Sequence, residues 1–339
     1  MLSDQHGRPL ASLRLSVTDR CNLRCSYCMP ESEYAWLPDA SILSPDELAR
    51  IARVFSSLGV RKVRLTGGEP LLRAELPEIV RRIASVGGVG EVALTTNGVL
   101  FAEQAAVLRD AGLKRVTFSL DTLDAARAKQ LSRTTRLADV FAGLERAYDL
   151  GYRETKINTV VMRGVNDDEL VKILDFGRKV DAEVRFLEYM DVGGATHWSM
   201  SQVVPKGEIL AHLEKAKGKA QPLGTDGPAP ATRYRLADGT TFGIIASTTE
   251  PFCMRCDRAR VTADGVYFPC LYAEKGIDLR SRLRQNASDD ELAQLLEEAW
   301  RGRSDRGAEV RVALKTRDVL IPVSRLRENT HWEMHTRGG

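Results

Sequence analysis

Two groups of three cysteines are the residues in this chain best suited to chemistry. They contain all six cysteines of the sequence: Cys21, Cys25 and Cys28, and then Cys253, Cys256 and Cys270. Thiolates this close together are typical ligands of zinc or of an iron–sulfur cluster. Structural zinc takes four protein ligands, whereas each group offers three and has no histidine at finger or ribbon spacing. A [4Fe–4S] cluster held by three thiolates explains the number, because one iron stays open to another ligand.

The second group is the weaker signal of the two. A Cys-x2-Cys pair followed by a distant cysteine occurs in many kinds of protein. Zinc and buried, inert thiols therefore stay open as alternatives, although the presence of the first group favours a second cluster.

Composition excludes several classes of protein and indicates a compartment. The net charge is +3, from 49 Lys+Arg and 46 Asp+Glu, which is too balanced for a surface that coats nucleic acid. Apolar runs fall short of the roughly 18 residues that cross a bilayer, so we expect no membrane segment. Residues 1–9 are polar and lack the apolar region of a signal peptide. We therefore expect a cytoplasmic protein with free thiols.

The elements that must position the cysteines follow an alternating pattern. Strands are expected at 12–18, 62–66, 91–95, 115–120, 154–162 and 183–189. Helices are expected at 45–58, 75–86, 101–111, 137–150 and 167–179. Strands that alternate with helices are usually parallel, with right-handed crossovers. The pattern predicts an α/β fold, an incomplete (β/α)6 TIM-type barrel, with an open doubly wound sheet as the alternative.

The chain divides into three parts by this reading. Residues 1–216 form the partial barrel, 217–246 form a linker and a hairpin at Asp238-Gly239, and 247–339 form a C-terminal extension. The extension contains the second cysteine group, a hairpin at Ala263-Asp264-Gly265 and a helix opened by Ser288. We expect it to close the barrel and to end in a Gly-Gly tail.

The spacing Cys21-x3-Cys25-x2-Cys28 after a strand resembles the radical S-adenosylmethionine (SAM) superfamily. The resemblance covers nearly the whole chain and is closest to the GTP 3′,8-cyclase family of molybdenum cofactor biosynthesis. The motifs that carry it are residues 14–20, Gly67-Gly68-Glu69-Pro70, 95–98, 119–121, 166–168, 188–193, 253–260 and Gly338-Gly339.

This resemblance implies a reaction and its cofactors. It implies two [4Fe–4S] clusters and SAM, with a 5′-deoxyadenosyl radical that removes H-3′ of GTP. The product would be (8S)-3′,8-cyclo-7,8-dihydroguanosine 5′-triphosphate, at the first step of the pathway. Implied partners are a one-electron reductant of the flavodoxin or ferredoxin type and the next enzyme, which makes cyclic pyranopterin monophosphate, with a homodimer as one option for the assembly.

The resemblance also implies roles for individual residues. The first cluster and the catalytic centre would take Cys21, Cys25, Cys28, Gly338 and Gly339. SAM would contact Tyr27, Gly67, Gly68, Glu69, Ser119 and Met190. GTP would contact Arg14, Lys62, Arg64, Thr95, Lys156, Arg185, Arg258, Ala259 and Arg260. The second cluster would take Cys253, Cys256 and Cys270.

Elementary chemistry is compatible with several of these roles. Glycine allows backbone to approach a ligand closely, and the Glu69 carboxylate suits the ammonium group of SAM. Lys62 and Arg64 alternate along one strand, so they share a face, and cations inside a barrel are costly without an anionic ligand.

Two other functions remain open from the sequence. One is another radical SAM enzyme with an auxiliary cluster, of the peptide-modifying maturase type, although such enzymes usually have more C-terminal cysteines. The other, from a different class, is a zinc-binding module without catalysis. Counting iron and sulfide after anaerobic reconstitution separates zinc from clusters.

Overall fold

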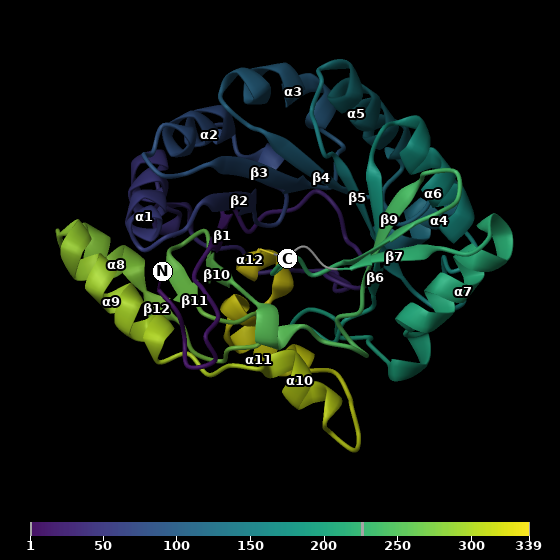
Figure 1. Ribbon diagram of the computed structural model, residues 1–339. Helices are drawn as coiled ribbons and strands as arrows, with labels where there is room; N and C mark the ends of the chain where they lie inside the picture. Colours follow the sequence, from purple (N-terminus) through teal and green to yellow (C-terminus); the bar gives the residue numbers. More distant parts are fainter. Residues whose placement is uncertain (1, 225–226, 339) are drawn as a thin grey trace.

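The computed structural model describes residues 2–224 and 227–338. Within these residues the strands form one 12-stranded sheet in the order β12-β11-β10-β1-β2-β3-β4-β5-β6-β9-β8-β7. The sheet curves into an arch with helices along its outer side, and the C-terminal segment runs into the inside (Figure 1).

Parallel strands make up the middle of the sheet. They are β1 (Ser12–Ser16), β2 (Lys62–Thr66), β3 (Glu91–Thr96), β4 (Arg115–Ser119), β5 (Lys156–Val161), β6 (Glu183–Glu188), β9 (Thr241–Ile245) and β10 (Arg258–Val261). Antiparallel strands form the two edges. These are β7 (Gln221–Gly224), β8 (Thr232–Arg235), β11 (Val266–Phe268) and β12 (Ile277–Asp278).

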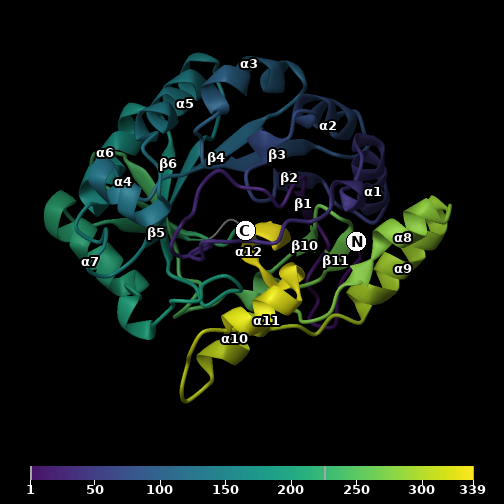
Figure 2. The ribbon, with the colours of Figure 1, turned by 180° about the vertical axis from the view of Figure 1, so that it is seen from behind.

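The helices fall into two sets. The first set is α1 (Pro45–Ser57), α2 (Leu76–Ala84), α3 (Phe101–Asp110), α4 (Ala125–Ser132), α5 (Leu137–Asp149), α6 (Leu170–Lys179) and α7 (Lys206–Lys217). The C-terminal set is α8 (Leu279–Arg284), α9 (Asp289–Arg301), α10 (Gly307–Val312), α11 (Val323–Glu328) and α12 (Met334–Arg337). Seen from behind, α10 and α11 lie across the open side of the arch (Figure 2).

Local sequence explains why the outer layer forms. At α1, Ser44 accepts a hydrogen bond from the Glu47 N–H while the Glu47 side chain accepts one from the Ser44 N–H, and Pro45 occupies the first turn. The apolar face of α1 then buries Leu48 and Phe55. Such faces pack on alternate strand residues and form one apolar core outside the sheet. The other face of each strand is left for the inside of the arch.

The predicted α/β fold with a mostly parallel sheet is confirmed. The expected strands correspond to β1–β6, with ends within about two residues, and an incomplete barrel remains our interpretation of the arch. The hairpins expected at Asp238-Gly239 and at Ala263-Asp264-Gly265 correspond to the antiparallel pairs β8–β9 and β10–β11. Through parallel pairing with β6 and β1, β9 and β10 extend the parallel sheet on its two sides. The division of the chain at residues 216 and 246 stays a prediction, and β7 to β9 continue the sheet from β6.

Helix α4 was not expected from the sequence. Its side chains include few large apolar residues, so no periodic apolar stripe marks it. Its one clear signal is Asp124, whose carboxylate accepts a hydrogen bond from the Arg127 N–H as an N-cap. Among the described residues, no helix combines the length and apolar character needed to cross a membrane.

Candidate active site

The N-terminal cysteines lie on the loop that follows β1. The loop turns tightly, because the N–H groups of Cys28 and Met29 both donate to the Cys25 carbonyl oxygen, at 3.0 and 2.7 Å. The Tyr27 hydroxyl donates a 2.7 Å hydrogen bond to Asp121, just beyond β4, and so anchors the loop across the sheet. All three thiols are free and partly buried.

These thiols resist ionisation while no metal is bound. Burial raises the pKa of Cys21 to about 11, and it also raises the pKa values of Cys25 and Cys28. Because metals bind the thiolate, a bound cation would offset this cost. Throughout residues 2–224 and 227–338, no three Cys, His, Asp or Glu side chains converge closely enough to hold a single ion. Three thiols on one short loop fit a cluster that takes three protein ligands.

Gly67 and Gly68 pack against the chain just before the cysteines. A β-carbon on Gly67 would lie 2.1 Å from the Thr18 carbonyl oxygen, and one on Gly68 would lie 2.2 Å from that of Arg20. The φ angle of Gly67 is also +147°, which other residues rarely adopt. Backbone hydrogen bonds of 2.9 Å from Gly68 and 2.7 Å from Glu69 join the two loops. The glycines therefore fix the position of the cysteine loop.

Glu69 connects the loops after β2 and β3. Its buried carboxylate accepts hydrogen bonds from the Thr96 hydroxyl and from the N–H groups of Leu71 and Asn97, at 2.7, 3.1 and 2.7 Å. Burial nevertheless raises the pKa of Glu69 to about 7. Asn97 in turn donates a 2.8 Å hydrogen bond to Asn22, between the first two cysteines. Glu69 thus supports the cysteine loop in addition to its expected contact with SAM.

The residues expected to contact SAM share one rim of the sheet. Each lies at or just after the carboxyl end of a parallel strand: Tyr27 after β1, Gly67, Gly68 and Glu69 after β2, Ser119 at the end of β4, and Met190 after β6. In barrel-like α/β folds this rim carries the ligand-binding loops. Met190 also lines the cavity described next.

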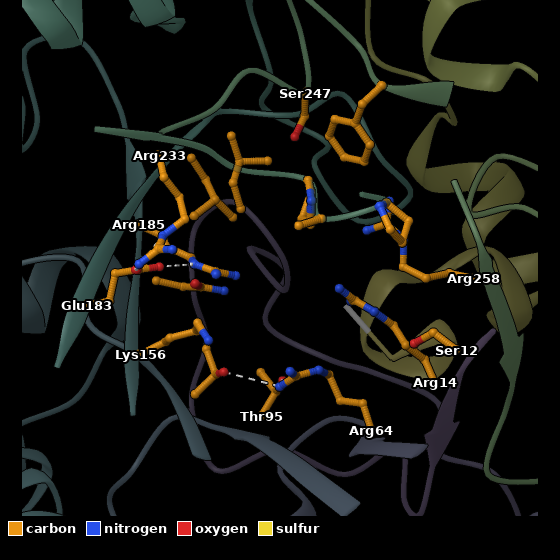
Figure 3. Close-up of a pocket in the computed structure, with 18 of the residues that line it drawn as sticks. Ser12, Arg14, Arg64, Thr95, Lys156, Glu183, Arg185, Arg233, Ser247 and Arg258 are labelled. Carbon is orange, nitrogen blue, oxygen red and sulfur yellow. Dashed lines mark hydrogen bonds and ion pairs between the residues drawn. The ribbon is translucent and has the colours of Figure 1, made fainter. Parts of the chain in front are cut away.

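A cavity of about 1160 Å³ occupies the inside of the arch. Its lining includes the second cysteine group and the expected GTP contacts Arg14, Lys62, Arg64, Thr95, Lys156, Arg185, Arg258 and Arg260. Figure 3 shows Arg14 and Arg258 on one wall and Lys156 and Arg185 on the opposite wall, with their side chains pointing toward the middle. Ala259 is the exception, because it is buried in register with core residue Leu13.

The sheet register places several of these cations side by side. Arg14 of β1 is in register with Arg260 of β10 and with Arg64 of β2. The row continues through Ala93 of β3 to Arg115 of β4. Residues in register share a face of the sheet, and like charges in that arrangement repel each other. An anion bound in the cavity would offset this repulsion.

Burial and mutual repulsion lower the pKa values of Arg14, Arg64 and Lys156 in the cavity. Burial and then the charge of Arg260 lower the pKa of Arg14 well below its ordinary range. Burial and Arg14 lower the pKa of Arg64 to about 9, and burial and Arg185 lower that of Lys156 to about 7. A polyanion inside the cavity would reverse these effects, since it stabilises the charged forms.

In the second cysteine group, positive charge favours a thiolate at Cys256, whereas burial raises the pKa values of Cys253 and Cys270. Burial alone would raise the pKa of Cys256, but Arg258 and Arg303 outweigh it and lower the pKa to about 7. N–H groups at the start of α10 donate to the Cys253 thiol, although burial keeps its pKa raised. This group also offers three thiols and fits a three-thiolate cluster.

The C-terminal tail, with α12, runs into the inside of the arch (Figure 1). Arg337 lies over the Phe268 ring at 4.3 Å and donates to the carbonyl oxygens of Leu271 and Ala273, which follow Cys270. The carbonyl oxygen of Gly338 then reaches the arginine row. Gly339, expected to act with Gly338, lies outside the described residues.

Arg115 and Arg233 are among the cavity residues that had no expected role. Arg115 begins β4 and Arg233 lies on β8, and both line the cavity with the cations above. The sequence contained a signal for Arg115, because Arg115 is the first residue of β4 just as Lys62 is the first residue of β2. For Arg233 it was not, because the pairing of β8 through β9 to β6 connects segments distant in sequence.

Two family matches together cover most of the chain. Residues 15–177 match the radical SAM superfamily, and residues 182–309 match the family described as Molybdenum Cofactor Synthesis C. Among solved structures, Streptococcus suis SuiB bound to its precursor peptide SuiA has a TM-score of 0.60 at 16% identity, covering 91% of this chain and 68% of that one. At that identity the likeness shows the fold.

Curated relatives are similar over the full length. GTP 3′,8-cyclase 3 of Mycobacterium bovis is 54% identical over 342 residues, which cover 100% of this chain and 90% of the relative. GTP 3′,8-cyclase of Aquifex aeolicus is 44% identical over 317 residues, which cover 93% and 96%. With an N-terminal three-cysteine loop, an arginine-lined cavity and these relatives, the chain belongs to the GTP 3′,8-cyclase family of the radical SAM superfamily.

Proposed function

We propose that this protein is the enzyme that converts GTP to (8S)-3′,8-cyclo-7,8-dihydroguanosine 5′-triphosphate, the first step of molybdenum cofactor biosynthesis. The observation that carries the proposal is the row of Arg260, Arg14 and Arg64 in register inside a cavity that also contains a cysteine group. Cations that destabilise one another in the free protein are suited to a nucleoside triphosphate.

The superfamily implies one [4Fe–4S] cluster and SAM, and Cys21, Cys25 and Cys28 would hold that cluster. When bound, the cluster and SAM would supply a 5′-deoxyadenosyl radical, formed with one electron from the reductant and with release of methionine, for removal of H-3′ of GTP. This chain would orient the methionine end of SAM with the backbone of Gly67 and Gly68, whose missing side chains leave the loop compact.

The remaining SAM contacts would come from the same rim. Tyr27 is fixed by Asp121, and Glu69 by its three hydrogen bonds, so both are ordered before SAM arrives. Ser119 and Met190 would complete the site from the ends of β4 and β6. An ordered site loses less conformational entropy on binding.

GTP would lie in the cavity with its phosphates among Arg14, Lys62, Arg64, Lys156 and Arg185. Thr95, which accepts a 3.1 Å hydrogen bond from Arg64, helps to orient that guanidinium. Ala259 would contribute through its backbone, since its side chain packs in the core.

A second [4Fe–4S] cluster on Cys253, Cys256 and Cys270 would take the guanine. Arg258 and Arg260 belong to the strand that follows Cys256, so they would meet the nucleotide next to this cluster. Gly338, whose carbonyl oxygen meets Arg260, would border the reacting atoms, and Gly339 would act with it in the reaction.

The reaction also requires partners. A flavodoxin- or ferredoxin-type protein would supply electrons, and the enzyme that makes cyclic pyranopterin monophosphate would take the product. Free thiols and iron–sulfur clusters suit a reducing compartment, which supports the cytoplasm. A homodimer is the assembly that we would test first.

Anaerobic turnover of the reconstituted protein with SAM, a reductant and GTP deuterated at C3′ tests the proposal. We expect one deuterium in the 5′-deoxyadenosine produced, together with a cyclised nucleotide. The Cys25→Ala variant serves as the control and should yield neither product. Unlabelled 5′-deoxyadenosine and intact GTP would contradict the proposal.

A further inference from the structure

Arg115 and Arg233 line the cavity without a role in the site described so far. They come from β4 and β8, and both lie near the Lys156 and Arg185 side of the cavity, where Figure 3 labels Arg233 beside Arg185. The charge of Arg115 lowers the pKa values of both Lys156 and Arg185, which places all three in one electrostatic cluster.

The sheet register brings Arg233 to Arg185. Gly243 of β9 is in register with Arg185 on one side and with Arg233 on the other. A β-carbon on Gly243 would lie 3.3 Å from Cγ of Arg185, so the glycine leaves space for that side chain. Both guanidinium groups bind Glu183: Nε of Arg185 at 3.1 Å, and Nε and Nη2 of Arg233 at 2.8 and 2.7 Å.

Arg115 is held in a similar way at the start of its strand. It pairs with Glu91 and, at 2.6 Å, with Glu154, while Lys156 lies 3.8 Å from the same Glu154 carboxylate. The side chain of Arg115 is 11% exposed. Its Nε is buried and, within the part of the chain that the structure describes, has no hydrogen-bond partner. A buried donor without a partner is costly and suits a ligand oxygen.

Carboxylates therefore hold these cations before any ligand binds. Glu91, Glu154 and Glu183 lie at or just before the first residues of β3, β5 and β6, on the rim opposite to the cysteine loop. Their contacts fix the guanidinium groups, and fixed groups lose little entropy when they bind. One guanidinium group can bind two oxygens of a phosphate at once. Arg115 and Arg233 could therefore distinguish a nucleoside triphosphate from a diphosphate by binding its additional phosphate.

We propose that Arg115 and Arg233, together with Lys156 and Arg185, form the subsite for the terminal phosphates and set the preference for triphosphate over diphosphate. The inference rests on the proposed function, in which guanine lies at the cysteine group on the wall of Arg258. The phosphates then extend toward the opposite wall, where Figure 3 labels Lys156, Arg185 and Arg233. Arg115 also lines the cavity and pairs with Glu154, the carboxylate that lies near Lys156.

Anaerobic calorimetry on the reconstituted protein with GTP, GDP and GMP tests the subsite. Arg233→Met and Arg115→Met should each weaken GTP binding by about tenfold or more, as expected for the loss of a charge-assisted contact. GMP binding should change by less than about twofold. The matched control is Arg301→Met on α9, because Arg301 is 62% exposed and pairs with Glu297. It should bind all three nucleotides as the wild type does.

The outcomes separate the inference from the proposed function. Failure of the wild type to bind GTP would overturn the proposed function. A wild type that prefers GTP to GDP, with the same preference in both variants, would overturn the subsite alone. Arg115→Lys and Arg233→Lys keep the charge without the bidentate geometry, so they serve if a methionine variant does not fold. The preference of these lysine variants for GTP over GDP should fall between that of the wild type and that of the methionine variants. A preference equal to that of the wild type would contradict the subsite.

Discussion

The carbonyl oxygen of Gly338 accepts a 2.6 Å hydrogen bond from Nη1 of Arg260 on β10. Nη1 of Arg14 lies 3.5 Å from the same oxygen, so the tail meets two neighbours of the arginine row at once. Backbone carbonyl oxygens partly satisfy buried guanidinium groups. Gly338 is therefore linked by hydrogen bonds to two residues that we expect to bind GTP.

Replacing Gly338 with alanine should displace the tail and reduce turnover. The added β-carbon would lie 2.4 Å from Cγ2 of Thr66 and 2.6 Å from Oγ of Ser16, and Gly338 has a φ of +70°. We expect kcat to fall by about tenfold or more, because small displacements at a reacting site are costly. The melting temperature should stay within a few degrees, since the tail contributes little to the main apolar core.

Gly151→Ala is the matched control for this substitution. Gly151 also has a φ of +70°, but nothing lies within 4 Å of its added β-carbon. It should therefore lose about 1 kcal/mol of stability through backbone strain and keep its activity. Equal activity of the two variants would show that the tail does not act in the reaction.

The sequence predicted the elements whose signals are local. Ser44 and Glu47 mark the start of α1, and alternating apolar residues mark β1 to β6. The register could not be predicted, because it depends on pairing between distant segments. Arg14 meets Arg260 only because β10, from the other end of the chain, pairs with β1.

The site was predictable to a similar extent. The cysteine groups and the glycine pair have short sequence motifs. The structure places the first cysteine loop after β1 and the glycine pair after β2, in contact with the residues just before the cysteines. Arg233 had no such motif, since its place in the cavity depends on Gly243 and two strand pairings. The hydrogen bonds of Glu69 could not be predicted either, because Thr96 and Asn97 are distant from it in the sequence and meet it only in the folded protein.

Binding of GTP should weaken above neutral pH through Lys156. Burial and Arg185 lower the pKa of Lys156 to about 7, so the free protein loses this charge above pH 7. The phosphates favour the charged form, and binding must then take up a proton. Between pH 7.5 and 9 the affinity should fall by up to about tenfold per pH unit. Calorimetry in buffers of different ionisation enthalpy should detect proton uptake.

Lys156→Met removes the titrating group and tests the assignment. This variant should bind GTP more weakly at pH 7 but show a flatter dependence above it. Lys156→Arg keeps its charge at these pH values and should bind with little pH dependence as well. The wild-type slope in both variants would assign the titration to another group.

Removing the second cysteine group should halve the iron content. With two [4Fe–4S] clusters the reconstituted wild type should contain about eight irons, and Cys253→Ala/Cys256→Ala/Cys270→Ala should contain about four. SAM binding should persist in this variant, because the first group lies on the loop after β1. Binding of GTP should weaken, since the cavity loses the three thiols, and with them the cluster, expected to take the guanine. Four irons in the wild type, or equal loss of SAM and GTP binding, would contradict a substrate-binding second cluster.

The polar N-terminus forms a buried ion network beneath the second cysteine group. Asp4 binds Arg8 at 2.5 Å and Arg303 at 3.3 Å, and the three side chains are at most 1% exposed. The arginines in turn donate to the carbonyl oxygens of Cys253 and Cys256, each at 2.9 Å. The network therefore holds the backbone of the cysteine loop.

Asp4→Asn should destabilise this part of the protein. Two buried guanidinium groups would lose their counter-charge, which typically costs about 3 kcal/mol or more. We expect a lower denaturation midpoint and faster loss of the iron held by Cys253, Cys256 and Cys270 to a chelator. The control is Asp39→Asn, since Asp39 pairs with Arg20 but is 82% exposed. Loss of that exposed pair should cost less than about 1 kcal/mol and leave iron release unchanged. Equal effects of the two substitutions would show that the network does not support the cysteine loop.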